Sequence, residues 1–488
     1  MEIRPSLDRV LELCSKGKYG RIPVSCEILS DVRTPIEVLR ILKGVSRHCY
    51  MLESASEHQT WGRYSFLGFD PGMEITCRSG LFKAGDTQVE TDDPGAYIRQ
   101  ILKDHLSPSF DYLPPFTGGL VGYFSYDYLK YAEPTLRLDA PDSEGFKDVD
   151  LMLFDKVIAF DNYRQKIILI VNICADDPEK AYAEAKEELE SLRDLIENGT
   201  PVRDRPGMIT GETKALFEEK EFCEMVEKAK HHIFEGDIFQ IVLSNRLEAP
   251  FEGSLLGTYR ILRTVNPSPY MFYFSSDDLE VAGASPETLV KLEDGVLHTF
   301  PLAGTRPRGK TEEEDRALEE ELLKDPKELA EHSMLVDLGR NDLGRISKFG
   351  SVEVEKAFQV LRYSHVMHIG STVRSVIRDD KDALDAVGAV LPAGTLSGAP
   401  KIMACQLIND LEQCARGIYG GALGYLSFTG NLDLCIAIRL AYRKNGKVFV
   451  RSGAGIVADS VPEKEYRECI NKAAAVISSL ELAKEVES

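Results

Sequence analysis

Apolar runs in the first part of the chain predict β-strands. Runs at residues 49–53 and 64–67 are short and mostly apolar, and each includes an aromatic residue, which favours strands. Residues 156–160 and 166–171 flank the turn residues Asp161-Asn162, and this spacing predicts a hairpin. An amphipathic run at 178–197 then predicts a helix.

Tight turns dominate the strand-rich parts of the remaining sequence. Glu293-Asp294-Gly295, Gly430-Asn431 and Asn445-Gly446 each lie between β-rich runs, where hairpin turns are expected. Helical patterns come in separate blocks at 219–234, 312–323, 326–338, 382–390, 401–414 and 461–484. Strands and helices that do not alternate regularly indicate an α+β fold with largely antiparallel sheets.

A change in composition divides the chain. Residues 198–211 contain three glycines, two prolines and mixed charge, which is typical of a linker. We therefore expect a first region at 1–197, a linker at 198–211 and a second region at 212–488.

Composition narrows the class of protein. The 488 residues are 43% hydrophobic and 28% charged, as expected for a globular protein. A net charge of −21 argues against non-specific binding to nucleic acid. The N-terminus lacks an apolar signal core and no apolar stretch reaches the length of a membrane helix, so we expect a cytoplasmic protein with no membrane partner. Ten cysteines without CxxC pairs predict reduced thiols rather than disulfides or zinc.

Two pairs of glutamates have the spacing of metal ligands. Glu328/Glu331 and Glu465/Glu468 are three residues apart near the starts of two predicted helices, so each pair faces one way. We expect Asp325 to cap the first helix with Glu328 closing a capping box, and Ser460 to begin the second. Four carboxylates could hold one hard cation, and Mg²⁺ is the candidate. A solvated charged face is the alternative explanation of either pair alone.

Two glycine-rich segments match nucleotide-binding patterns. Residues 304–311 fit the P-loop expression, but Pro307 removes a backbone donor and the following glutamates would repel phosphates. Residues 453–458 fit the dinucleotide fingerprint, but no second parallel strand follows. We expect Gly453, Ala454 and Gly455 to form instead a glycine nest that binds a carboxylate.

Polar and glycine residues of the second region specify a ligand class. Arg439, Lys472, Tyr419 and the glycine nest would bind carboxylates, while Glu287 and His368 remain for proton transfer. A small polycarboxylate is therefore the expected substrate. Without further context, His368, His332 and His365 would each be read as core histidines, and Glu287 as a turn cap.

Long motifs in the second region resemble one enzyme family. PLAGTRPRG, KELAEHSMLVDLGRNDLGR, LPAGTLSGAPK, RGIYGGALGY and SGAGIVADSVPEKEYRE are similar to segments of the chorismate-utilising enzymes, and in particular of the anthranilate synthase large subunits. The resemblance covers nearly the whole chain and implies a β-sandwich core flanked by helices.

The resemblance assigns roles to the residues above. It implies Glu331 and Glu468 as direct Mg²⁺ ligands, with Glu328 and Glu465 nearby. It further implies that chorismate is bound by Gly304, Thr305, Tyr419, Arg439, Gly453, Ala454, Gly455 and Lys472. In the implied reaction ammonia adds at C2, Glu287 protonates the departing C4 hydroxyl, and His368 then removes the C2 proton as pyruvate leaves.

Two positions distinguish members of this family. Relatives that add water have a lysine where this chain has Gln240, and an amide cannot act as that base. Many aminodeoxychorismate synthases have a lysine where this chain has Ala303. Both differences favour anthranilate as the product; aminodeoxychorismate or isochorismate synthase is the alternative, and a P-loop nucleotide-binding protein is a distant one.

The resemblance also implies regulation and a partner. Met51-Leu52-Glu53-Ser54 is similar to the family's LLES motif at a tryptophan feedback site. By this match L-tryptophan would lie among Glu53, Ser54, Pro269, Tyr270, Met271 and Cys435. No cysteine lies in the Gly-x-Cys-x-Gly motif of glutamine amidotransferases, so a separate amidotransferase subunit would supply the ammonia.

Overall fold

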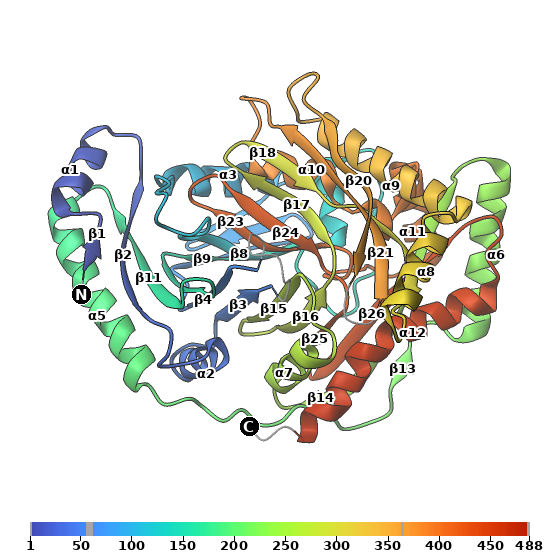
Figure 1. Cartoon of the computed structure of the whole chain (residues 1–488), viewed down its shortest axis with the longest axis horizontal. Helices are drawn as coiled ribbons and strands as arrows, with labels where there is room; N and C mark the ends of the chain where they lie inside the picture. The colour runs from blue at the N-terminus through green and yellow to red at the C-terminus, as the bar shows by residue number, and fades with distance from the viewer. Residues whose placement is uncertain (1, 55–61, 363–365, 486–488) are drawn as a thin grey trace.

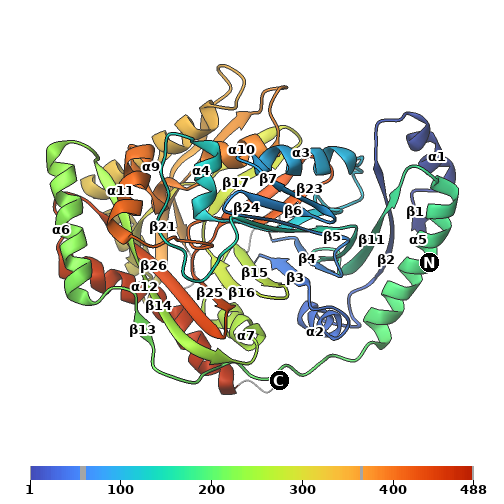
Figure 2. The same ribbon diagram turned by 180° about the vertical axis from the view of Figure 1, so that it is seen from behind.

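Two large antiparallel sheets pack face to face and helices cover their outer faces (Figures 1 and 2). The computed structural model describes residues 2–54, 62–362 and 366–485. Every pairing between the named strands of this part of the chain is antiparallel, because hairpin turns connect many of the neighbours. The α+β class and the β-sandwich core predicted above are confirmed.

The first sheet has fourteen strands among the described residues. Their order is β1 (Ile3–Arg4), β2 (Arg21–Leu29), β11 (Lys166–Cys174), β10 (Lys156–Asp161), β4 (Tyr64–Phe69), β3 (Cys49–Glu53), β15 (Tyr270–Ser275), β16 (Glu280–Ser285), β25 (Leu440–Lys444), β26 (Lys447–Ile456), β14 (Gln240–Glu252) and β12 (Met208–Ile209), with β13 (Lys214–Ala215) and β22 (Gly398–Ala399) also paired to β14.

The second sheet has twelve strands in the same part of the chain. Their order is β19 (Leu302–Pro307), β21 (Val366–Val376), β18 (Val296–Thr299), β17 (Thr288–Glu293), β24 (Leu432–Ile436), β23 (Ala422–Ser427), β8 (Gly119–Phe124), β9 (Val149–Phe154), β5 (Met73–Arg78), β6 (Leu81–Ala84) and β7 (Thr87–Glu90), with β20 (Glu353–Arg362) also paired to β21.

Both sheets continue across the expected linker. In the first sheet β3 pairs with β15, with Glu53 opposite Met271. In the second sheet β8 pairs with β23, with Gly122 opposite Gly424. The segment after α5 (Pro178–Asn198) runs along one edge of the molecule to β13 (Figure 1). Strands from both regions of the sequence therefore form each of the two sheets. The predicted boundary at 198–211 does not coincide with a break in either sheet, and the division into domains stays a prediction.

Hydrophobic side chains fill three layers. Aromatic residues from both sheets, among them Tyr50, Phe154, Phe272 and Phe449, form the core between the sheets. On the outer face of the first sheet pack α2 (Pro35–Val45), α5, α7 (Leu256–Val265) and α12 (Pro462–Leu482). On the second sheet pack α3 (Pro94–Asp104), α9 (Pro326–Gly344) and α10 (Ala383–Val390). Of these helices, the sequence predicted α5, α9, α10 and α12, and their apolar residues form the buried faces. The sequence analysis did not predict α2, α3 or α7.

Five further helices and three 3₁₀ turns of the described residues complete the fold. They are α1 (Leu7–Ser15), α4 (Leu129–Ala132), α6 (Glu219–Glu235), α8 (Glu312–Leu322), α11 (Lys401–Glu412), and the 3₁₀ turns η1 (Tyr126–Tyr128), η2 (Gly394–Leu396) and η3 (Ala483–Glu485). None of the helices in the described ranges is long and apolar enough to cross a membrane.

Several local predictions need correction. Asp325 does cap α9, but Glu328 forms an ion pair with Arg306 instead of closing a capping box. Ser460 does not cap α12, whose N-cap is Val461, because its hydroxyl accepts a hydrogen bond from the backbone N–H of Val457. The glycines at 453 and 455 are part of strand β26 and not of a loop, since they pair with β14.

Candidate active site

Glu287 lies in the short connection between β16 and β17. Its Oε1 accepts a hydrogen bond from Thr395 Oγ1 at 3.1 Å. Burial raises the pKa of the Glu287 carboxyl to about 7, and this hydrogen bond and the charges of Arg439 and Lys472 oppose the rise. A carboxyl with a pKa near 7 retains its proton in a large fraction of molecules at neutral pH, as a general acid must.

His368 on β21 contacts two residues of the neighbouring strand β19. Its Nδ1 lies 3.0 Å from Thr305 Oγ1 and 3.0 Å from the backbone oxygen of Gly304. A carbonyl oxygen only accepts, so Nδ1 donates and the lone pair of the neutral ring is on Nε2. Burial lowers the pKa of His368, and the nearby charge of Arg439 lowers it further. A neutral imidazole with its lone pair on Nε2 is able to accept a proton.

The positively charged Arg439 lies close enough to Glu287 and His368 to affect the pKa of each. It lies in the bend between β24 and β25 with φ of 51°, in the left-handed region. Its positive charge acts on the pKa of Glu287 and on that of His368. The charge of the predicted carboxylate ligand therefore acts on both the predicted acid and the predicted base, although two of these residues lie in different strand connections and His368 lies on β21.

Strand β26 forms a second wall with Tyr419 and Gln240. A Cβ atom at Gly453 would lie 2.9 Å from the Tyr419 hydroxyl, and one at Gly455 would lie 3.1 Å from Gln240 Nε2. Gln240 is 6% exposed, and its Oε1 has no hydrogen-bond partner among the residues that the structure describes. Lys472 Nζ on α12 donates to the backbone oxygen of Gly453 at 3.1 Å. The backbone of β26 is thus closely approached by polar groups on several sides, which explains the need for glycine there.

The four glutamates of the predicted metal site lie on α9 and α12. Burial raises the pKa of Glu331, and the negative charges of Glu328 on its own helix and of Glu468 on the other helix raise it further. Burial also raises the pKa of Glu465, with Glu468 adding to the rise. Mutual repulsion of this kind is relieved by a cation. The chemistry of the donor set therefore fits Mg²⁺, which prefers carboxylate oxygens.

The carboxylates have protein cations as partners. Lys472 Nζ lies 2.6 Å from Glu468, and Arg306 lies 3.2 Å from Glu328. Among the described residues no group of three or more acidic, histidine or cysteine side chains is already arranged to hold a metal ion. Binding a cation would therefore require rearrangement of these side chains.

The P-loop match is not a nucleotide site. Residues 302–307 form β19, which pairs antiparallel with β21. The backbone N–H groups of Gly309 and Lys310 donate to Asp315 and Glu314, both at 2.6 Å. Carboxylates of α8 thus occupy the donors that would bind a phosphate.

A cavity of about 400 Å³ lies between the sheets, and its lining includes every residue of the predicted inhibitor site. These are Glu53, Ser54, Pro269, Tyr270, Met271 and Cys435. Tyr270 donates a hydrogen bond to Asp433 at 2.7 Å and accepts one from Thr288 at 3.0 Å. The carboxylate of Glu53 accepts from Tyr259 at 2.6 Å and pairs with Arg263, so its charge is already matched inside the protein.

Two residues of these sites escaped the sequence prediction. Thr395 lies within LPAGTLSGAPK, but no spacing in the sequence connects it to Glu287, which is 108 residues earlier. Ser371 lines the inter-sheet cavity and contacts His332, which is buried as predicted. His365 lies outside the described residues.

Comparison with known proteins identifies the family. Residues 47–478 match the family model described as chorismate binding enzyme. The chain is 43% identical over 494 residues to an anthranilate synthase component 1 from Acetivibrio thermocellus, with 99% of each chain covered. It is 45% identical over 495 residues to the same component from Aquifex aeolicus, again with 99% of each covered.

Solved structures show the same fold. The crystal structure of anthranilate synthase component I from Streptococcus pneumoniae has a TM-score of 0.76 and 37% identity, covering 92% of this chain and 98% of that one. A menaquinone-specific isochorismate synthase from Escherichia coli, at 20% identity, has a TM-score of 0.71 over 98% of this chain and 100% of its own. This second likeness concerns the fold alone.

Proposed function

Because the chain belongs to the chorismate-binding enzyme family, we propose that it converts chorismate and ammonia to anthranilate and pyruvate, as the large component of an anthranilate synthase. The relatives that support this carry the name of that component and cover 99% of the chain. The structural observation that carries the proposal is the placement of Arg439, whose charge acts on both Glu287 and His368, while Thr395 fixes the carboxyl and Gly304 fixes the imidazole.

The substrate pocket suits a dicarboxylate. Arg439 and Lys472 supply positive charge, while the Tyr419 hydroxyl lies against the backbone of Gly453. Gly304, with φ of 64°, brings β19 close to Glu328, so that a Cβ there would lie only 3.2 Å from Glu328 Oε2. We assign the binding of chorismate to these residues together with Thr305, Ala454 and Gly455.

In the first step ammonia forms a bond to C2 and the C4 hydroxyl leaves as water. Glu287 donates the proton that makes the hydroxyl a leaving group, and its pKa of about 7 suits this task. The buried Oε1 of Gln240 has no hydrogen-bond partner in the described ranges, so it can accept a hydrogen bond from ammonia and orient the nucleophile. The product of this step is aminodeoxyisochorismate.

In the second step His368 removes the proton from C2. The bond between C3 and the enolpyruvyl oxygen breaks, the ring becomes aromatic, and pyruvate leaves after gaining a proton. The Gly304 carbonyl fixes Nδ1 as the donor, so Nε2 carries the lone pair that receives the proton.

Glu331 and Glu468 would hold Mg²⁺, with Glu328 and Glu465 beside them. When bound, the ion would neutralise the substrate carboxylate and act as a Lewis acid on the ring. Lys472 would have to turn from Glu468 towards the substrate as the cation arrives.

Gln240 and Ala303 favour anthranilate over the products of sister enzymes. An amide does not deprotonate water as the lysine of isochorismate synthases does. Ala303 on β19 has no amine with which to attack the ring. Ammonia needs neither group.

We also propose feedback regulation and a partner. L-Tryptophan would occupy the 400 Å³ inter-sheet cavity lined by Ser54 and Met271. The term component 1 in the names of the relatives indicates a second component, and a glutamine amidotransferase is the chemistry that would supply ammonia.

The test is product analysis. The purified chain is incubated with chorismate, Mg²⁺ and ammonium at alkaline pH, and products are separated by chromatography with fluorescence detection. Anthranilate and pyruvate in equal amounts are expected. Aminodeoxychorismate without pyruvate, or isochorismate, would contradict the proposal and assign the chain to a sister activity.

A further inference from the structure

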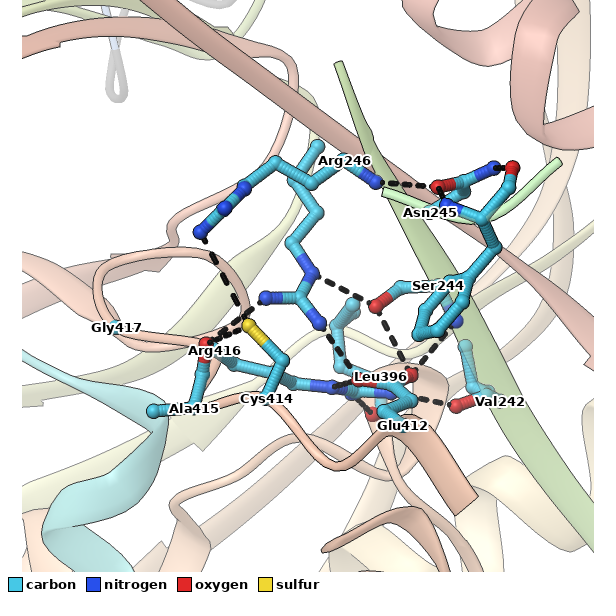
Figure 3. Close-up of polar contacts among 12 residues, drawn as sticks. Val242, Ser244, Asn245, Arg246, Leu396, Glu412, Cys414, Ala415, Arg416 and Gly417 are labelled. Carbon is cyan, nitrogen blue, oxygen red and sulfur yellow. Dashed lines mark hydrogen bonds and ion pairs between the residues drawn. The ribbon is translucent and has the colours of Figure 1, made fainter. Parts of the chain in front are cut away.

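A buried cluster of ion pairs lies next to Tyr419, one of the residues proposed to bind chorismate. Glu412, Arg416 and Arg451 are each at most 2% exposed. Arg416 pairs with the carboxylate of Glu412 at 2.5 Å (Figure 3). Arg451 pairs with the same carboxylate at 2.7 Å. The cluster connects the end of α11, the loop that follows it, and strand β26.

Every oxygen of Glu412 is used within the cluster. Oε1 accepts from the backbone N–H of Ser244 at 2.8 Å and from its hydroxyl at 2.9 Å, and Oε2 accepts from both arginines. Arg451 Nε in turn donates to the Ser244 hydroxyl at 2.9 Å. Charge-assisted bonds of this kind favour one geometry strongly.

The two arginines bind the backbone of the segments that carry proposed site residues. Arg416 donates to the backbone oxygens of Leu396 at 2.7 Å and Val242 at 2.8 Å. Leu396 follows Thr395, which donates to Glu287, and Val242 lies two residues after Gln240. The guanidinium groups of Arg416 and Arg451 each lie 5.9 Å from the centre of the Tyr419 ring.

Arg451 also precedes Gly453 by two residues on β26. One cluster therefore contacts four separate segments, and each of them supplies a residue to the pocket: β14 with Gln240, η2 with Thr395, the loop with Tyr419, and β26 with Gly453. These segments are far apart in the sequence and share no other buried ion pair among the described residues.

Stability alone does not explain such a cluster. Removing three charges from water is costly, and apolar residues of similar volume would serve packing as well or better. Buried polar groups can instead specify one arrangement of the chain.

We propose that Glu412, Arg416 and Arg451 are positioning residues that hold the chorismate pocket in its binding geometry before the substrate arrives. The inference rests on the proposed function. In this proposal the cluster aligns Tyr419 and Gly453 to bind the substrate. It also holds Thr395 in the position from which Thr395 donates its hydrogen bond to Glu287.

The test compares three variants of the full chain: Ser244→Ala, Arg416→Lys and Glu412→Gln. Ser244→Ala removes only one hydroxyl from the cluster, so it should fold even if Glu412→Gln does not. We expect kcat/KM for chorismate to fall about 10- to 100-fold in Arg416→Lys, mostly through KM, because small misplacements of a site cost that much. A smaller rise in KM is expected for Ser244→Ala.

The matched control is Glu280→Gln. Glu280 is also buried and accepts a hydrogen bond from a serine hydroxyl, Ser254, at 2.6 Å, next to the cation of Lys43. We expect it to lower the melting temperature but to leave KM within twofold of the wild type, with assays run well below every melting temperature.

Direct binding separates alignment from chemistry. Titration calorimetry with chorismate and Mg²⁺, without ammonia, should show the same loss of affinity in the cluster variants. Unchanged KM and affinity in both Ser244→Ala and Arg416→Lys, or an equal rise in KM in Glu280→Gln, would overturn the inference. Absence of anthranilate from the wild type would instead reject the proposed function.

Discussion

The hydroxyl of Ser371 lies 2.7 Å from Nε2 of His332. Ser371 lines the 400 Å³ inter-sheet cavity, whereas His332 is fully buried on α9 next to Glu331. The backbone N–H of Phe358 also donates to the Ser371 hydroxyl, at 3.0 Å. One hydrogen bond therefore links the wall of the proposed inhibitor cavity to the helix that carries a proposed metal ligand.

Ser371→Ala should weaken feedback inhibition more than inhibitor binding. Without the hydroxyl, a change in the cavity wall is transmitted less directly to α9, so we expect the tryptophan concentration for half inhibition to rise at least about fivefold, within the usual range of coupling energies. Calorimetry of tryptophan binding gives the affinity separately.

Ser375→Ala is the control for this prediction. Ser375 is a buried serine on the same strand, bonded to Ser347 at 2.7 Å and outside the cavity lining. If Ser375→Ala relaxed inhibition as much as Ser371→Ala, the hydrogen bond to His332 would have no special part in the coupling.

The pH dependence of the first step should follow Glu287. The carboxyl must be protonated to act as an acid, and its pKa is about 7, so the active fraction falls as pH rises through that value. Rates compared at equal concentrations of free ammonia should therefore decline above pH 7. If total ammonium were held constant instead, the concentration of free ammonia would increase with pH. The faster reaction with ammonia would then mask the decline.

Glu287→Gln keeps the side-chain size but removes the transferable proton. We expect kcat to fall about 10²- to 10⁴-fold, the usual contribution of general acid catalysis, and the alkaline decline to vanish from the residual rate. A variant that kept the wild-type rate would exclude Glu287 as the acid.

His368→Ala should separate the two steps. The first step does not need the base, so aminodeoxyisochorismate should accumulate, while pyruvate release slows about 10²- to 10⁴-fold. Rapid quench followed by chromatography measures both. Normal rates of both steps would show that another group removes the C2 proton.

Glu331→Gln should weaken Mg²⁺ binding. Removing one charged ligand should raise the Mg²⁺ concentration for half-maximal activity at least about tenfold. The same variant should lose the Mg²⁺-dependent rise in melting temperature measured with chorismate present. The control is Glu320→Gln, which is expected to change neither. Glu320 is an exposed residue of α8 that pairs with Lys324, beyond the end of that helix. Equal effects in both variants would point to general electrostatics.

Gly304→Ala should impair the site through sterics. Gly304 has φ of 64°, and a Cβ there would lie 3.0 Å from Leu322 and 3.2 Å from Glu328 Oε2. Because left-handed backbone is strained for alanine, we expect β19 to shift at Thr305 and KM for chorismate to rise. Gly295→Ala, at φ of 80° in open space, is strained similarly but lies in a turn outside the site. If KM for chorismate rose equally in Gly304→Ala and Gly295→Ala, backbone strain alone would explain the rise.

Local rules in the sequence predicted many elements closely. Strand β3 has the predicted bounds, and the turns at Asp294-Gly295 and Asn445-Gly446 join paired strands. Helix α9 continues six residues beyond the predicted end at Leu338, because Leu343 is buried in the core and extends the apolar contact. Tertiary packing overrides local propensity at such ends.

The candidate site also combines features that are visible in the sequence with contacts that only the tertiary structure forms. Glycines, the Glu-x-x-Glu pairs and the choice of Gln240 over lysine are visible in the sequence, because side-chain chemistry and short spacings are local properties. The family resemblance connected them into one site.

The sequence by itself determined the class of fold, the types of catalytic group and the ligand chemistry. Only the tertiary structure decided which groups meet: Thr395 with Glu287, Ser371 with His332, and Glu412 with Arg416 and Arg451. It also placed Gly453 in a strand rather than a loop. Strand pairing, burial and the resulting pKa shifts arise from contacts between residues distant in the chain, and a one-dimensional pattern does not encode those distances.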